Sequence, residues 1–477
     1  MIKGLFINGK EVESANTYAV IQSHTEEEIA QVADATEEEM QEAIDRAHEA
    51  FRKMKALTSN KRAEILYKAA DLLEEEKEEF ARVIALEACK PITAARSEVD
   101  RSVQTLRFSG EEAKHIAGEY IPLDAAKGGE GRDAYTIHEP IGVIGAITPF
   151  NFPLNLVVHK VGPALASGNT IIVKPAEQTP LSSLKLAGLF TKAGLPDGAF
   201  NVVPGEGPKL GKVMLEDSRI QKISFTGSPQ VGKLIKSQAG LKRVTLELGS
   251  NSALYVDNSA SDSLQKIAGK AVTGAFIYNG QVCISTQRIY VHEGMFEAFK
   301  QAFVEKTNEL AFGDPLDDET MVTSLINKKS QERILSWIDE AVENGATLLT
   351  GGERKANGIL PTVLTGIQSS DKVSCREIFG PVVILQPVQN HEEALQLMNE
   401  SDFGLNAGVF TNNLQQALKI AHSLDVGQVL VNDVPTTRFD HMPYGGVKDS
   451  GYGHEGIKYA IKEMTRLKMI SLNYCCF

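Results

Sequence analysis

IGVIGAITPFNFPLNLVVHKVGPALASGNTIIVKPAE, residues 141–177, gives the clearest indication of how the chain folds. It opens with a short apolar run (141–148), continues with apolar residues at helical spacing (155–166) and ends in a second apolar run (169–175). A strand, a helix and another strand in this order predict a βαβ unit with parallel strands. The alternation continues through three further strand-like runs, FNVVPG (200–205), KISFTGS (222–228) and VTLELG (244–249). The sequence therefore predicts a doubly wound, Rossmann-like α/β sheet, on which ligands bind beyond the carboxyl ends of the strands.

A second alternating block follows. Its strand-like runs are ALYVD (253–257), RIYVH (288–292), PVVILQPV (381–388) and GQVLVN (427–432). The chain has 477 residues, which exceeds the roughly 250–300 at which a single core stops growing. We therefore expect two α/β domains with a cleft between them and a break near 247–255. Amphipathic helical patterns at 36–56 and 60–88 precede the first block.

Composition excludes several classes of protein. A hydrophobic content of 42%, a charged content of 23% and a net charge of −13 spread along the chain are typical of a globular enzyme, and no basic stripe indicates a nucleic-acid partner. The five cysteines are odd in number and scattered, with no C-x-x-C pair, so neither a disulfide framework nor a metal site is expected. Without a signal-peptide or membrane-spanning pattern, we expect a cytoplasmic protein with free thiols and no membrane association.

One cysteine lies in a sequence motif that is typical of a catalytic residue. Cys283 lies in NGQVCIS (279–285), where an Asn-Gly turn lets the backbone approach a ligand closely. Glu247 lies in TLELGS (245–250), on the opposite side of a strand from Leu246 and Leu248. A thiol and a lone carboxylate predict covalent catalysis, in which the thiol attacks and the carboxylate activates water.

Further candidates lie at the ends of predicted strands. SFTGSPQVGK (224–233), with Gly227 and Gly232, and PGEGPKLG (204–211) are glycine-rich turns that either cradle a phosphate or simply join a strand to a helix. Lys174 and Glu177 follow a strand where a carboxylate suits a ribose diol and repels a 2′-phosphate, and their alternative is a solvated salt bridge.

Two more motifs place candidate binding residues at the ends of predicted strands. Asn151, in TPFNFPL (148–154), offers an amide to an oxyanion or else forms an Asx turn. Glu377 and Phe379, in EIFGPVV (377–383), could hold a ribose and a flat ring.

Taken together, the motifs resemble the aldehyde dehydrogenase superfamily over essentially the whole chain. TPFNFPL, KPAE, FTGS, LELG, GQVCIS, EIFGPV and PYGGVKDSG (443–451) occur in the family's order. The resemblance implies NAD(P)-dependent oxidation of an aldehyde to an acid by a homodimer or homotetramer. It also implies a cofactor domain (1–122 and 142–247), a catalytic domain (248–455), and an oligomerisation arm with a C-terminal segment (123–141 and 456–477).

The resemblance also assigns roles. Cys283 would be the nucleophile, Asn151 with the Cys283 backbone N–H would hold the oxyanion, and Glu247 would be the general base. The cofactor, NAD with NADP as the alternative, would be held by Pro149, Phe150, Lys174, Glu177, Gly207, Gly211, Gly227, Ser228, Gly232, Leu248, Glu377 and Phe379. No metal ion is implied.

The chain departs from the family pattern beside the base. Ser250 replaces the usual second glycine of ELGG, which puts the backbone near Glu247 in question. The proline often found a few residues after the base is also replaced, the run being SNSALY (250–255). The ending YCCF is also unusual for the arm, and Cys475 and Cys476 are interpreted as bystanders.

The run at 98–125 most resembles the group acting on lactaldehyde, phosphonoacetaldehyde and sulfo-aldehydes. By that analogy Arg107, Arg438 and His441 lie near the substrate tunnel, and converging cations would favour an anionic substrate. The alternative is that Arg107 and Arg288 form ordinary salt bridges and only Arg438 meets solvent. Two other functions compete: a CoA-acylating relative, which commonly lacks a base at the Glu247 position, and a non-catalytic protein on the same scaffold.

Overall fold

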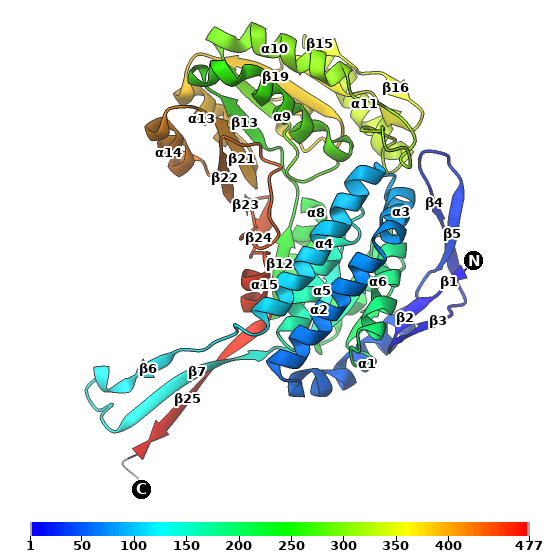
Figure 1. Cartoon of the computed structure of the whole chain (residues 1–477), viewed down its shortest axis with the longest axis vertical. Coiled ribbons are helices and arrows are strands. Elements are labelled where there is room, and N and C mark those ends of the chain that lie inside the picture. The colour runs from blue at the N-terminus through cyan, green and yellow to red at the C-terminus, as the bar shows by residue number, and fades with distance from the viewer. Residues whose placement is uncertain (1, 475–477) are drawn as a thin grey trace.

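The computed structural model describes residues 2–474 and contains two α/β units and a projecting β arm (Figure 1). Cys475 and Cys476 lie outside the described residues. The first unit is built on an eight-stranded sheet in the order β24-β12-β11-β8-β9-β10-β2-β3. Its parallel strands are β8 (Val143–Ile147), β9 (Thr170–Lys174), β10 (Phe200–Val202), β11 (Ile220–Thr226) and β12 (Arg243–Glu247).

The order of these strands confirms the doubly wound fold. From β8 the chain adds β9 and β10 on one side, then returns to add β11 and β12 on the other. The order therefore reverses between β8 and β11, which is where such sheets open a crevice for ligands. Antiparallel strands complete the edges, with β24 (Gly451–Tyr452) beside β12, and β2 (Leu5–Ile7) with β3 (Lys10–Val12) beyond β10.

Helices cover both faces of the first sheet. One face packs against α2 (Ser59–Glu75), α3 (Lys77–Ala88), α4 (Ile92–Glu112), α5 (Asn155–Ala166) and α6 (Leu181–Lys192). The other packs against α1 (Glu37–Ala56), α7 (Gly207–Glu216) and α8 (Pro229–Gln238). The helical pattern expected over 60–88 is interrupted at Glu76, which joins α2 to α3.

The second unit has a seven-stranded sheet in the order β15-β18-β19-β14-β13-β21-β22. All but β15 (Thr347–Thr350) run parallel; the others are β13 (Ala253–Val256), β14 (Arg288–His292), β18 (Thr362–Thr365), β19 (Val382–Val388), β21 (Asn406–Phe410) and β22 (Gln428–Val431). The covering helices are α9 (Leu264–Phe276), α10 (Glu293–Asn308), α11 (Lys328–Glu343), α13 (His391–Asn399) and α14 (Leu414–Ser423). The chain crosses from the first sheet to the second between Glu247 and Ala253.

The arm extends away from both units (Figure 1). It consists of β6 (Tyr120–Pro122), β7 (Arg132–Pro140) and β25 (Thr465–Asn473), ordered β25-β7-β6. The arm sheet thus begins at Tyr120, earlier than the expected 123, because β6 pairs with β7. The expected boundary at 455 also shifts, since β24 joins the first sheet and α15 (Ile457–Glu463) packs into the first unit's core.

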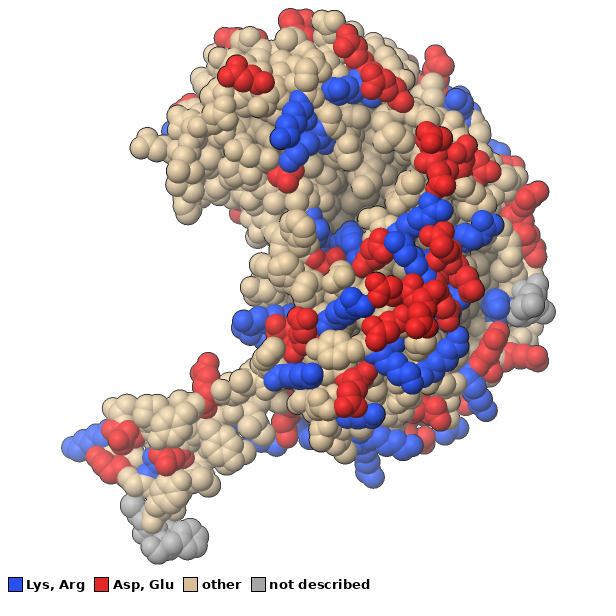
Figure 2. All heavy atoms as spheres, in the orientation of Figure 1, with Lys and Arg blue, Asp and Glu red and all other residues tan. Residues whose placement is uncertain are grey.

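The remaining elements are short. They are β1 (Ile2–Lys3), β4 (Thr17–Ile21), β5 (Glu28–Ala33), η1 (Leu123–Ala125), η2 (Asn258–Ser263), η3 (Ile277–Gly280), β16 (Arg354–Lys355), β17 (Gly358–Ile359), α12 (Lys372–Cys375), β20 (Phe403–Gly404) and β23 (Val447–Lys448). Within residues 2–474, no helix combines the length and apolar character needed to cross a membrane. On the face in Figure 2, acidic and basic side chains are interleaved and the surface is hollowed between the two units.

Candidate active site

A cavity of 970 Å³ lies beyond the carboxyl ends of the first sheet, at the point where the strand order reverses. Both units line it. Most of the predicted residues are in its lining: Pro149, Phe150, Asn151, Lys174, Glu177, Gly207, Gly211, Gly227, Ser228, Leu248, Cys283, Glu377 and Phe379. The predicted residues outside the lining are Gly232, Glu247, Arg107, Arg438 and His441. Gly232 instead makes room for Leu248, because a Cβ there would lie 2.4 Å from Leu248 Cδ2.

One end of the cavity carries a paired carboxylate. Glu177 accepts hydrogen bonds from Lys174 Nζ and from the Gly207 N–H, each at 2.7 Å. Burial opposes ionisation, but the Lys174 charge and these hydrogen bonds hold the pKa of Glu177 below its usual value. The charged carboxylate and the bare backbone of Gly207 at the start of α7 suit a ribose diol next to a phosphate.

The loop that leads to Cys283 has an unusual backbone. Tyr278, Asn279 and Gly280 adopt left-handed conformations in succession, with φ of 48°, 57° and 68°. A Cβ at Gly280 would lie 2.2 Å from the Gly380 carbonyl oxygen, so the close approach that the Asn-Gly pair permits is to the protein's own backbone. The Asn279 side chain fixes the turn by donating to the Ser324 carbonyl and accepting from the Thr323 N–H.

Both the side chain and the backbone of Asn151 are hydrogen-bonded. Its side-chain amide donates to the Gln281 carbonyl at 2.9 Å, next to the Cys283 loop, and its backbone carbonyl accepts from Lys90 Nζ at 2.6 Å. Lys90 is paired in turn with Glu98, and both side chains are buried. An NH₂ group with one hydrogen committed retains a second, which is what an oxyanion donor requires.

Glu247 ends β12 and is only 3% exposed, with both carboxylate oxygens lacking a hydrogen-bond partner among the described residues. Burial, reinforced by the nearby charge of Glu455, raises its pKa well above the usual value. Glu455 is paired with Lys160 at 2.5 Å, and Lys160 also donates to Thr226. A partnerless carboxyl with a raised pKa is suited to accepting a proton from water.

Tyr444 and Arg438 lie close to Cys283. The Tyr444 hydroxyl lies 3.0 Å from Cys283 Sγ, and the Arg438 guanidinium lies 3.6 Å above the Tyr444 ring. Burial raises the pKa of the Cys283 thiol to about 11, while Tyr444 and Arg438 act in the opposite direction. Sequence reasoning missed Tyr444, although it stands in the quoted PYGGVKDSG motif.

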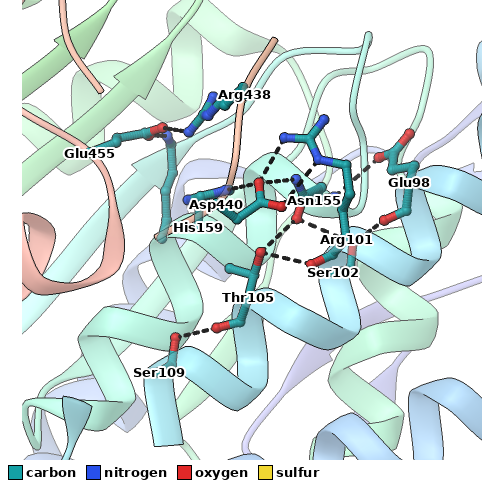
Figure 3. A network of polar contacts seen from close by, with 11 residues as sticks. Glu98, Arg101, Ser102, Thr105, Ser109, Asn155, His159, Arg438, Asp440 and Glu455 are labelled. Carbon is teal, nitrogen blue, oxygen red and sulfur yellow. Dashed lines mark hydrogen bonds and ion pairs between the residues drawn. The ribbon is translucent and has the colours of Figure 1, made fainter. Parts of the chain in front are cut away.

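A buried polar network adjoins this group (Figure 3). Asp440 accepts two hydrogen bonds from Arg101, at 2.7 and 3.1 Å, one from His159 Nε2 at 2.8 Å and one from Asn155 at 3.1 Å. These residues come from α4, α5 and the segment after β22. None of them was predicted, because Arg101, Asn155 and His159 are isolated polar residues on helices, Asp440 lies in a loop, and none of the four belongs to a motif.

The residues predicted to lie near the substrate have different surroundings in the structure. Arg107 is paired with Asp71 and Glu74 on a half-exposed surface, as the salt-bridge alternative expected. His441 is exposed and packs against the Phe108 ring. The expectation that Arg438 meets solvent is wrong, since its side chain is 7% exposed. Arg288 binds backbone carbonyls of Asn251, Leu397 and Met398 rather than carboxylates.

Ser250 is accommodated without strain. Its N–H donates to Glu377 at 2.9 Å, and its backbone does not adopt a positive φ. Burial raises the pKa of Glu377 to about 7. Within the described residues, no group of three or more His, Cys, Asp or Glu side chains is arranged to hold a metal ion.

Comparison with known proteins agrees with this arrangement. The profile described as "Aldehyde dehydrogenase family" matches residues 10–470. A 3-sulfolactaldehyde dehydrogenase of Priestia megaterium is 46% identical over 98% of both chains, and a lactaldehyde dehydrogenase of Methanococcus aeolicus is 39% identical over 99% of both. The solved structure of the glyceraldehyde-3-phosphate dehydrogenase GapN from Methanocaldococcus jannaschii, complexed with NADP, superposes with a TM-score of 0.92 at 37% identity, covering 96% of this chain and 100% of that one.

Proposed function

The chain belongs to the aldehyde dehydrogenase family, and on that premise we propose that it oxidises a short polar aldehyde to its acid through a thioester on Cys283, hydrolysed with Glu247 as base. The observation that carries this proposal is the meeting of three groups from distant parts of the chain. Cys283 and Asn151 line one cavity, and the partnerless Glu247 ends a strand beside it. On this proposal the first unit is the cofactor domain and the second the catalytic domain.

The residues divide the chemistry as follows. The Cys283 thiolate attacks the carbonyl carbon, and the resulting oxyanion is held by the free N–H of the Asn151 amide and by the Cys283 backbone N–H. When bound, the nicotinamide cofactor supplies the acceptor for the hydride. Glu247 then removes a proton from water, which adds to the thioester and releases the acid and the thiolate.

We propose NAD as the preferred cofactor. Lys174, Glu177 and Gly207 fit the adenosine ribose, because the Glu177 carboxylate can accept from its hydroxyls. The same negative charge would face the 2′-phosphate of NADP. The glycines at 207 and 211 leave the backbone open to the pyrophosphate, and Ser228, which also lines the cavity, caps the start of α8.

We propose an anionic substrate. Arg438 is buried, its Nε has no partner among the described residues, and its one paired carboxylate, Glu455, is 3.5 Å away. Arg101 is 30% exposed on the side chain and shares Asp440 with His159. Two of the relatives described above act, by their names, on anionic aldehydes, the sulfonate and the phosphate, and one on the neutral lactaldehyde.

A panel of aldehydes tests both parts of this proposal by NADH production. Succinate semialdehyde, glyceraldehyde 3-phosphate, phosphonoacetaldehyde and sulfolactaldehyde form the anionic set, and lactaldehyde, glycolaldehyde and propanal the neutral one. We expect kcat/KM for the best anionic substrate to exceed that for lactaldehyde by tenfold or more, about 1.4 kcal/mol. Arg438→Gln should remove this preference, whereas the matched surface variant Arg107→Gln should leave it intact. A preference for the neutral set would overturn the anionic assignment, and no NADH with any aldehyde would overturn the activity.

We also propose that the protein is a cytoplasmic homodimer or homotetramer. The arm exposes large apolar side chains, Leu467, Met469 and Leu472, and β22 forms an edge of the second sheet. Because unpaired strand edges and exposed apolar rows favour pairing with another chain, the arm of one subunit would cover a second subunit. Sedimentation of the intact chain against a variant lacking residues 465–477 measures this: a monomer for the intact protein would overturn it.

A further inference from the structure

Tyr444 approaches the reacting sulfur itself. Its hydroxyl oxygen lies 3.0 Å from Cys283 Sγ, and both side chains pack into the core of the first unit. Tyr444 is 2% exposed, so water does not compete for this contact. Either atom could donate in the neutral state, but only the hydroxyl can donate once the thiol has lost its proton.

Electrostatics decide which of the two groups ionises. Burial raises the pKa of Tyr444 well above its usual value, so the phenol keeps its proton when the thiol, with a pKa of about 11, loses its own. Glu247 at the end of β12 and Glu377 before β19 oppose the thiolate. Arg438 and the Tyr444 hydroxyl, both from the segment after β22, favour it.

Arg438 holds the tyrosine in place. Its guanidinium stacks 3.6 Å above the ring, an arrangement that fixes the ring plane and withdraws electron density from it. Ion pairing with Glu455 holds the guanidinium itself. The hydroxyl is therefore directed at the sulfur by a packed stack and not by a mobile side chain.

We propose that Tyr444 is a further catalytic residue, whose O–H stabilises the Cys283 thiolate before attack, with Arg438 as the residue that positions it. This rests on the proposed nucleophile. Before attack the Cys283 S–H bond breaks and its proton passes to water; during attack the sulfur–carbon bond forms and the carbonyl π pair moves to the oxygen held by Asn151. Tyr444 keeps its proton throughout and loses only its anionic acceptor.

The proposal predicts two opposing effects in Tyr444→Phe. A hydrogen bond to the thiolate lowers the thiol pKa, so its loss should raise the apparent pKa of Cys283 by one unit or more. The thiolate fraction below the pKa then falls tenfold, but a more basic thiolate is intrinsically about threefold more reactive. The net rate of alkylation by iodoacetamide, a neutral reagent, should fall about threefold at neutral pH.

The experiment measures the thiolate absorbance of Cys283 against pH, taken as the difference from Cys283→Ala, together with the alkylation rate. Tyr255→Phe is the matched control, because it removes a buried hydroxyl bonded to Asp257 in the second unit. Tyr444→Leu, which also lacks the hydroxyl, provides a second test should the first variant unfold. A Cys283 pKa unchanged in both Tyr444 variants overturns the role of Tyr444.

The Cys283→Ala variant distinguishes a failure of the proposed function from a failure of the inference about Tyr444. If Cys283→Ala retains turnover, the nucleophile is misassigned and the proposed function fails. If Cys283→Ala is inactive and the Tyr444 variants titrate like the unmodified enzyme, only the inference about Tyr444 fails.

Discussion

The two α/β units contribute to the site from opposite ends of their strands. In the first unit the functional groups lie at carboxyl ends: Lys174 ends β9 and Glu247 ends β12. In the second unit they lie before amino ends, since Cys283 precedes β14 and Glu377 and Phe379 precede β19. The first arrangement is the general one for parallel sheets. The second requires loops to carry the reactive groups.

The loops of the second unit differ in backbone as well. Tyr278, Asn279 and Phe379 are not glycines and yet have positive φ, of 48°, 57° and 51°. Left-handed conformations of such residues cost on the order of 1–3 kcal/mol each and persist only where the surroundings enforce them. Regular strand ends hold the proposed base and the proposed ribose-binding pair, whereas a strained, tightly bonded turn holds the proposed nucleophile.

The largest expected effect shows which chemical step depends on each unit. Cys283→Ala in the second unit should abolish both the first burst of NADH and steady turnover, by at least about 10³-fold. Glu247→Gln in the first unit should keep the burst and lose the steady rate, because only hydrolysis needs the base. Rapid-mixing measurements of NADH check this. The control Glu87→Gln alters a buried carboxyl that caps α6 and should retain turnover. Steady turnover in Glu247→Gln would assign the base elsewhere.

The next effect tests whether the strained turn is needed. Gly280→Ala adds a Cβ 2.2 Å from the Gly380 oxygen at a φ of +68°. We expect Cys283 to move by a fraction of an ångström or more, with activity falling about 100-fold and the melting temperature decreasing. The control is Gly188→Ala within α6, where a Cβ would meet nothing within 4 Å and the change should be neutral or slightly stabilising. Equal activity in the two variants would show that the turn does not position the thiol.

A smaller effect is expected at the regular strand end. Glu177→Gln keeps an acceptor for Lys174 and Gly207 but removes the charge. Since the Glu177 side chain is 41% exposed, solvent weakens its repulsion of a 2′-phosphate, and we expect about a tenfold rise in kcat/KM with NADP relative to NAD. The rate of Cys283 alkylation should not change. An unaltered cofactor ratio would remove Glu177 from the discrimination.

The contrast between the units also explains what the sequence could predict. Strands and their short motifs are local, so β14 has the bounds expected, and the strand-end motifs named Lys174, Glu177 and Asn151. Arg101 and Asp440 are 339 residues apart and meet only through the fold. The analogy predicted Arg107 as a substrate residue and did not consider Arg101. Six residues along a helix turn the side chain by about 240°, which places the two arginines on different faces of α4.

The smallest expected effect concerns the residue that joins the units. Glu455 contacts Lys160 of α5 and Arg438 of the segment after β22, and its charge is one reason that the pKa of Glu247 is raised. A base works when deprotonated, so the hydrolysis rate should fall as the pH drops through this raised pKa. Glu455→Gln removes the negative charge and leaves both cations, which should lower the pKa of Glu247 and move the acid limb of kcat down by about one pH unit.

The comparison variant for this shift is Glu463→Gln, which alters a carboxylate at the end of α15 that is paired with Lys222 at 3.7 Å. It should leave the acid limb in place. An acid limb that moves upward in Glu455→Gln would mean that Glu455 takes the proton from Glu247 rather than merely raising its pKa. The base would then be part of a chain of three groups, Glu247, Glu455 and Lys160. The first unit would depend on the segment after β22, which carries Glu455, as much as the Cys283 thiol depends on its turn.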